Sequence, residues 1–245
     1  MIDESNTEDM KGRILFMAGT IMHLVIADRL LDRLNIENPA LFYCGNLAPD
    51  AIMARENYVR DMKTHTHFKD GLKNYEFRIK SNQEAYRKKL LDFAKFFLKR
   101  DDPHYELYLG YIVHILVDEL YLLEYYEEFL VELEKKNIAP TDETFGRAFV
   151  ADVDRVDWEL VRNYQFRYPM PEILLSISGY EIPGWITASE IEESKSFIIN
   201  KNFICTHEKE ALEVTTYEKN KEFMDICVSR IPEMLAFKVP WTGAK

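Results

Sequence analysis

The stretch GYIVHILVDEL, Gly110–Leu120, places a histidine and an aspartate among residues typical of a protein interior. His114 and Asp118 are four residues apart, so a helix presents both on one face, with Cβ atoms about 5–6 Å apart. A buried carboxylate is costly unless it is paired or binds a metal ion. The spacing suits two ligands of one metal ion, and it suits a His–Asp hydrogen bond equally well. On these two residues alone, the hydrogen-bonded pair is slightly favoured.

The stretch lies in the longest predicted helix, residues 103–136. Its first half is apolar nearly all round, which predicts a central position. Apolar residues at helical spacing predict the other helices. One of them is expected to begin at Pro39 and to be broken at Pro49. These helices cover residues 12–35, 39–49, 82–99, 142–164, 188–200 and 209–235, with an ordered loop or short helices at 51–75 and a looser segment at 169–184.

No internal repeat, low-complexity tract or linker divides the chain. The sequence therefore predicts an all-α, single-domain protein over residues 1–245. Within it we expect a flexible N-terminus at 1–11, a core that carries the candidate site at 12–136, and C-terminal helices at 137–245.

The composition restricts the classes of partner. The chain has 245 residues, 47% of them hydrophobic, and a formal net charge of −11. Such an acidic surface repels phosphate backbones and anionic lipids, which disfavours general nucleic-acid binding and stable membrane association. The acidic start MIDESNTEDM is unlike a signal peptide, so we expect a cytoplasmic location. Three cysteines without CxxC spacing are expected to be small buried hydrophobes: Cys44, Cys205 and Cys227.

Other polar residues stand where ordinary core residues are expected. His23 lies inside the apolar run MAGTIMHLVIA, Asp50 directly follows Pro49, and His65 and His67 occur together in KTHTHF. Each alone has an ordinary interpretation, as a satisfied core histidine, a turn residue or a surface loop. Together they are harder to dismiss, and His and Asp are the ligands expected for zinc, manganese or iron. The familiar HExxH, ExxH, His-Asp, CxxC and glycine-rich phosphate-loop patterns are absent from the sequence.

Four short motifs occur in a definite order: MHLVIADRLL (22–31), GNLAPDA (45–51), THF (66–68) and YLGYIVHILVDE (108–119). This series resembles the zinc-dependent phospholipase C family, which shares a helical fold and a trinuclear zinc site with fungal single-strand nucleases. Each motif is weak alone, but the order and spacing of all four are fairly specific. The resemblance covers roughly residues 15–120 and implies a phospholipase C/nuclease-type helical bundle.

Carried over residue by residue, the resemblance implies that Asp50, His67, His114 and Asp118 bind one zinc ion. Asp118 would also bridge to a second metal ion held by His23. Asp50 would in addition be the catalytic base that orients the attacking water. Two metal ions bridged in this way can activate a water and hold both oxygens of a phosphoester displacement.

The chain also departs from that family. The secreted members use an N-terminal tryptophan and a later His and Glu four residues apart as further metal ligands. Here the chain begins MIDES, the first histidine after His114 is His207, and Ala211 stands four residues beyond it. The resemblance with these departures therefore implies one or two zinc ions, and the His and Asp ligand types leave manganese or iron as alternatives.

The predicted function is hydrolysis of a small phosphoester by metal-activated water. Arg55, Lys63 and His65 lie between the Pro-Asp and His-Phe motifs and are candidate substrate-binding residues, although a solvated loop face explains such basic residues more often. The alternative is a non-catalytic helical binding protein with one structural metal or none. His23 separates these hypotheses, because only a second metal or a substrate contact requires it at the same site.

Overall fold

The computed structural model describes residues 18–135, 143–204 and 206–238. Apart from one antiparallel bridge between Ile182 and Ile186, regular structure in these ranges is helical. The segments are α1 (Thr20–Leu30), α2 (Pro39–Ala51), η2 (Ile52–Ala54), α3 (Arg60–Thr66), η3 (Asn74–Arg78), α4 (Lys80–Phe97), α5 (Tyr105–Leu120), η4 (Tyr121–Tyr125), α6 (Tyr126–Lys135), α7 (Glu143–Asn163), α8 (Met170–Leu175), α9 (Ala188–Ile198), η5 (Ile199–Ile204) and α10 (Tyr217–Lys238). The prediction of an all-α fold is therefore confirmed.

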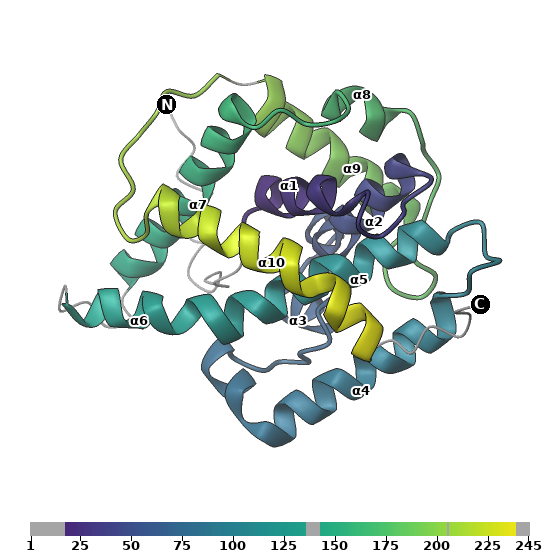
Figure 1. Cartoon of the computed structure of the whole chain (residues 1–245), viewed down its shortest axis with the longest axis horizontal. Coiled ribbons are helices and arrows are strands. Elements are labelled where there is room, and N and C mark those ends of the chain that lie inside the picture. Colours follow the sequence, from purple (N-terminus) through teal and green to yellow (C-terminus); the bar gives the residue numbers. More distant parts are fainter. Residues whose placement is uncertain (1–17, 136–142, 205, 239–245) are drawn as a thin grey trace.

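Helix α5 occupies the centre, as its apolar sequence predicts (Figure 1). Every residue from Leu107 to Leu120 is buried. Helices α1, α2, α4 and α10 pack around it, and α2 makes the most extensive contact. The helix that carries His114 and Asp118 is thus enclosed by elements from both halves of the chain.

Two glycines allow α2 and α5 to approach closely. A Cβ atom on Gly45 would lie 1.8 Å from the carbonyl oxygen of Leu107, and one on Gly110 would lie 2.1 Å from that of Phe42. Only glycine leaves room for backbones this close. Both glycines belong to motifs that also carry candidate ligands, so the contact brings the end of α2 toward the middle of α5.

Helix α1 is fixed at its N-terminus by α7. Both carboxylate oxygens of the buried Asp157 accept backbone N–H groups, from Ile21 at 3.0 Å and from Met22 at 3.1 Å. These are among the N–H groups that a helix start leaves without an intrahelical partner. Asp157 therefore caps α1 from a distant part of the sequence and fixes the helix that carries His23.

The predicted break at Pro49 is wrong, because α2 continues through Pro49 to Ala51. A proline this close to the end of a helix removes only one intrahelical hydrogen bond. The carbonyl of Pro49 accepts a hydrogen bond of 2.9 Å from the Thr66 hydroxyl, which satisfies one of the last carbonyl groups of the helix. Asp50 is therefore held on a helix instead of in a turn.

The predicted start of the last helix at residue 209 is also wrong, since α10 begins at Tyr217. The backbone N–H groups of Glu213, Val214 and Thr215 donate to the carboxylate of Asp152 on α7. N–H groups engaged in this way lie outside the helix. Tertiary contact thus overrides the apolar pattern that suggested an earlier start.

Some predictions lie outside the described residues: the flexible segment at 1–11, the first part of the helix at 12–35, and Cys205. Cys44 and Cys227 are free and buried, as predicted. Within the described ranges, no helix combines the length and apolar character that crossing a bilayer requires. The division of the chain at residue 136 stays a prediction.

Candidate metal centre

The fold brings together five side chains that are far apart in the sequence. His23 comes from α1, Asp50 from the end of α2, His67 from the residue after α3, and His114 and Asp118 from α5. Two overlapping groups of these residues could hold a metal ion. One contains His23, His114 and Asp118, and the other contains Asp50, His67 and His114.

Backbone carbonyls fix the tautomers of two of these histidines. Nδ1 of His114 lies 2.8 Å from the carbonyl oxygen of Asn46, and Nδ1 of His67 lies 2.8 Å from that of Lys63. Because a carbonyl only accepts, each Nδ1 carries the proton and each Nε2 presents a lone pair. The two Nε2 atoms face each other at 3.3 Å. Two lone pairs at this distance repel each other unless a cation lies between them.

Two carboxylate oxygens complete the group around these nitrogens. Nε2 of His67 lies 3.3 Å from Oδ1 of Asp50 and 3.4 Å from Oδ2 of Asp118, and Nε2 of His114 lies 3.9 Å from each of these oxygens. Ligands of a tetrahedral zinc ion with bonds of about 2.0–2.1 Å are about 3.3–3.4 Å from one another. The distances from Nε2 of His67 to the other three donor atoms are therefore those of neighbouring ligands of a zinc ion.

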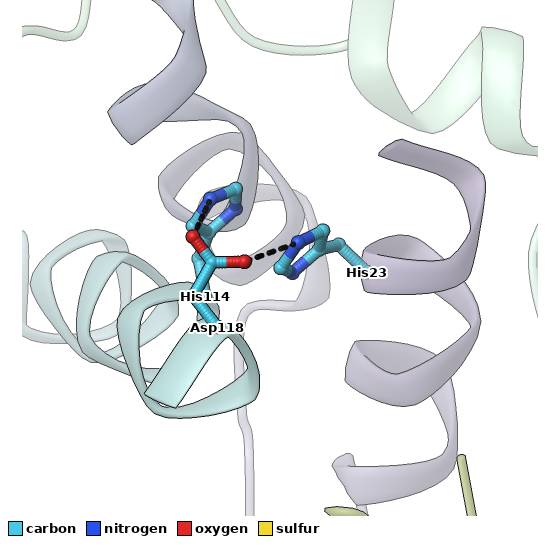
Figure 2. Close-up of side chains that lie close together, drawn as sticks. All are labelled: His23, His114 and Asp118. Carbon is cyan, nitrogen blue, oxygen red and sulfur yellow. Dashed lines mark ion pairs between the residues drawn. The ribbon is translucent and has the colours of Figure 1, made fainter. Parts of the chain in front are cut away.

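The second oxygen of Asp118 points the other way, toward His23 (Figure 2). Oδ1 of Asp118 lies 3.4 Å from Nε2 of His23, and the His23 ring stacks on that of His114 with centroids 3.8 Å apart. Both residues are buried. Among the described residues, neither oxygen of Asp118 and neither ring nitrogen of His23 has a well-formed hydrogen bond. Coordination of a metal ion would satisfy these buried polar atoms, which lack hydrogen-bond partners.

The protonation states also suit metal ligands, which must be neutral imidazoles and ionised carboxylates. Burial lowers the pKa of His67, and burial together with the nearby His23 holds the pKa of His114 well below its usual range. Burial acts to raise the pKa of Asp50, but the Lys63 ammonium and the His67 imidazole outweigh it and hold that pKa well below normal. In Asp118, His23 and Lys69 likewise outweigh burial, and the pKa is lowered.

An unusual turn positions His67 after α3. Phe68, Asp70 and Gly71 have positive φ angles of 59°, 42° and 81°. A bulky residue in this region is strained, so the surroundings must hold it. Thr64 does so, because its carbonyl accepts the Asp70 N–H at 3.1 Å and its hydroxyl accepts the Gly71 N–H at 2.8 Å. The turn buries the Phe68 ring among aromatic side chains while the preceding imidazole faces the donor group.

The three candidate substrate-binding residues have different environments. The Arg55 guanidinium binds both oxygens of Glu190 and the Trp185 carbonyl, which ties η2 to α9. His65 is exposed and pairs with Asp70 at 2.7 Å. Lys63 alone reaches the donor group, with Nζ 2.7 Å from Oδ1 of Asp50. A substrate-binding role for these residues stays a prediction, and the structure gives Arg55 a structural contact.

Sequence reasoning missed two residues beside the donor group. The Asn46 carbonyl orients His114 from within an apolar helix, and the buried Lys69 acts electrostatically on Asp118. Asn46 carried the same signal as His114, a polar residue among apolar ones. Lys69 carried no signal, because a lysine next to Asp70 in a turn is expected at the surface.

Comparison with known families agrees with this geometry. Residues 22–119 match the family described as zinc dependent phospholipase C. This part of the chain is similar to that family. The matched region includes all five candidate ligands, from His23 to Asp118, and the all-α architecture is the one that the resemblance to zinc-dependent phospholipase C implies. No curated protein and no solved structure gives a significant match to the chain.

The side chains gathered here therefore suit the zinc that the family's description names. Asp50, His67 and His114 could hold one ion, and His23, His114 and Asp118 form a second group that could hold one. A separate groove of about 480 Å³ lies between α1, α7 and α10 and is lined by none of the five candidate ligands.

Proposed function

We propose that the protein is a zinc-dependent hydrolase of a small phosphoester, with its active site at the five residues described above. The observation that carries the proposal is the pair of facing Nε2 lone pairs of His67 and His114, 3.3 Å apart, flanked by two ionised carboxylates. Zinc bound there would lower the pKa of a coordinated water and polarise a phosphoryl oxygen. The cytoplasmic location stays a prediction.

The residues of the chain would then have separate tasks. Asp50 is the most accessible of the candidate ligands, with 13% of its side chain exposed against 1–2% for the others. It is therefore the group best placed to orient a water that enters from solvent. Its strongly lowered pKa makes it a poor proton acceptor at neutral pH and favours a role in coordination and orientation. Asp118 has one oxygen toward His23 and the other toward His67, so its carboxylate would set the distance between two ions.

A second candidate is a structural zinc site without catalysis. Nε2 of His67 already lies 3.3–3.4 Å from Nε2 of His114, from one oxygen of Asp50 and from one oxygen of Asp118, and an ion with four protein ligands has no open position for water. Structural sites are, however, built mostly from cysteine, whereas this donor set contains only imidazole and carboxylate. The outward position of Asp50 and the approach of His23 also favour the hydrolase.

The test combines metal content with turnover. The untagged full chain, purified without chelator, is analysed by elemental mass spectrometry and assayed with p-nitrophenyl phosphate and bis(p-nitrophenyl) phosphate. The hydrolase predicts one or two zinc ions per chain and turnover that is lost in Asp118→Asn. Asp225→Asn, which changes an acidic residue paired with Arg29 on another face, is the matched control and should retain both properties.

His23→Gln separates the two candidates. If Asp118 bridges two ions, this variant should lose one ion and most of its turnover. One tightly held zinc ion that survives in His23→Gln, in a protein without turnover, would favour the structural site. A chain that takes up no metal after reconstitution would falsify both.

A further inference from the structure

One threonine contacts three of the segments that carry candidate ligands. Thr66 is the last residue of α3, it directly precedes His67, and only 1% of its surface is exposed. Its side chain reaches the end of α2, which carries Asp50, and its backbone carbonyl reaches α5, which carries His114. Segments that supply three of the five candidate ligands therefore converge on one buried residue.

The hydroxyl of Thr66 links His67 to the end of α2. Its oxygen lies 3.1 Å from Nδ1 of His67, 2.9 Å from the Pro49 carbonyl oxygen and 3.0 Å from that of Lys63. The Lys63 carbonyl already accepts two N–H groups of His67, from the backbone at 3.1 Å and from Nδ1 at 2.8 Å, and a carbonyl has two lone pairs. The hydroxyl proton is therefore directed to the Pro49 carbonyl, and the hydroxyl oxygen is free to accept from Nδ1–H.

This arrangement connects two candidate ligands through one side chain. Pro49 directly precedes Asp50 in α2, so the hydroxyl ties the backbone beside Asp50 to the imidazole of His67. A hydrogen bond at Nδ1 also fixes the orientation of the ring, and therefore the direction in which Nε2 points. Both contacts thus bear on the distance of 3.3 Å between Nε2 of His67 and Oδ1 of Asp50.

The backbone carbonyl of Thr66 forms the third link. It accepts a hydrogen bond of 2.6 Å from the phenol of Tyr111, which is completely buried on α5. Tyr111 and His114 are three residues apart in this helix, so their side chains lie on the same face of it. The Tyr111 ring also packs against the rings of Phe68 and Phe93, which restricts its movement. The end of α3 is therefore anchored to the helix that carries His114.

Such anchors matter most before a metal ion binds. The imidazoles of His67 and His114 present lone pairs 3.3 Å apart, and two carboxylates lie beside them. Lone pairs and negative charges directed at one point repel one another until a cation separates them. Contacts that hold the donors in place beforehand lower the cost of assembling the site, and this preorganisation appears as higher affinity for the ion.

We propose that Thr66 is a positioning residue of the metal centre. Its hydroxyl and its carbonyl hold three ligand-bearing segments in the arrangement that zinc binding requires, while the residue itself contacts neither the ion nor the substrate. The inference rests on the proposed function, because it concerns the same metal centre. It predicts that zinc affinity depends on the Thr66 hydroxyl itself and does not simply follow the stability of the metal-free chain.

The substitutions Thr66→Val and Thr66→Ser separate positioning from packing. Valine keeps the shape of threonine and removes the hydroxyl, whereas serine keeps the hydroxyl and removes a buried methyl group. Zinc affinity is measured on the full chain by competition with a chelator, and stability by thermal unfolding of the metal-free chain. We expect Thr66→Val to bind zinc about 10–100-fold more weakly than the parent chain, and Thr66→Ser to bind it about as tightly as the parent. Both variants should unfold at a lower temperature, because one leaves the Pro49 carbonyl without this donor and the other leaves a small cavity.

A threonine with a merely structural role would give a different result. Zinc affinity would then fall in both variants in step with their unfolding temperatures. That result, or unchanged zinc affinity in Thr66→Val, would overturn the inference. Thr216→Val is the matched control, because the Thr216 hydroxyl accepts the Lys219 N–H at 3.1 Å at the start of α10. This control should bind zinc as tightly as the parent chain.

The substitution Tyr111→Phe tests the third link and keeps the inference testable if Thr66→Val does not fold. It removes only the phenol oxygen and leaves a ring that can pack against Phe68 and Phe93. It should weaken zinc binding, and zinc affinity equal to that of the parent chain would overturn the inference.

The outcomes also separate the inference from the function on which it rests. If the parent chain binds no zinc, the proposed function fails. If the parent chain binds zinc and Asp118→Asn does not, while Thr66→Val binds it normally, only the positioning role of Thr66 is wrong.

Discussion

Substitution of Gly110 by alanine tests whether close packing of two helices builds the metal centre. The added Cβ would lie 2.1 Å from the carbonyl oxygen of Phe42 and 2.8 Å from the backbone nitrogen of Asn46. Carbon and oxygen atoms contact comfortably at about 3.3 Å, so α2 and α5 must separate by about 1 Å. Both obstructing atoms belong to the backbone and cannot rotate away. Overpacking of this kind costs about 3 kcal/mol, partly offset by about 1 kcal/mol from the higher helix propensity of alanine.

We therefore expect Gly110→Ala to lose about 2 kcal/mol of folding free energy and to unfold about 4–8 °C lower, by calorimetry. The same shift moves the Asn46 carbonyl from Nδ1 of His114, now 2.8 Å away, and moves Asp50 from the imidazoles. Zinc sites require ligand positions within about 0.2 Å, so zinc affinity should fall about 10–100-fold in competition with a chelator.

Gly179→Ala is the control for stability alone. Gly179 has a φ of 78°, and no atom lies within 4 Å of the position that an added Cβ would take, so alanine there adds backbone strain of about 1–2 kcal/mol without a clash. It should unfold at a lower temperature and bind zinc normally. If Gly110→Ala bound zinc as tightly as the parent chain, close approach of α2 and α5 would not be what positions the ligands.

Three further predictions concern single groups and the metal. Asp118→Ala should lose zinc and turnover together, and full metal content in that variant would contradict the bridging role of Asp118. Burial raises the pKa of Asp157 to about 7 from 3.8, so the unfolded state releases this proton first and stability falls as the pH rises from about 4 to about 7. Thermal unfolding of Asp157→Asn should lack this part of the pH dependence, worth up to about 4 kcal/mol, and identical profiles for the two proteins would refute it. Removal of zinc by a chelator should lower the unfolding temperature, because free zinc at about 100 times its Kd stabilises the folded chain by about 2.7 kcal/mol, and an unchanged unfolding temperature would contradict a folded-state zinc site.

The pattern of residues along the sequence was sufficient to predict many of the helices. The apolar sequence around His114 predicted a central helix, and Pro39 predicted the start of α2, where the Asn38 side chain accepts the Leu41 N–H at 3.2 Å. These features depend on hydrophobic periodicity and on helix caps, which involve residues close in sequence. The end of α2 and the start of α10 were mispredicted because contacts with distant residues determine them.

The sequence by itself determined which residues are candidates for the metal centre. A histidine or aspartate among apolar neighbours is conspicuous whatever the fold, and the order of the four motifs relates them to one family. Only the tertiary structure decided how these side chains meet. It turns Nε2 of His67 and His114 toward each other, directs the two oxygens of Asp118 to different histidines, and buries Lys69 beside them. Those relations depend on the approach of α2 to α5 and on the turn at Phe68, and periodicity along a chain carries no information about distances between helices.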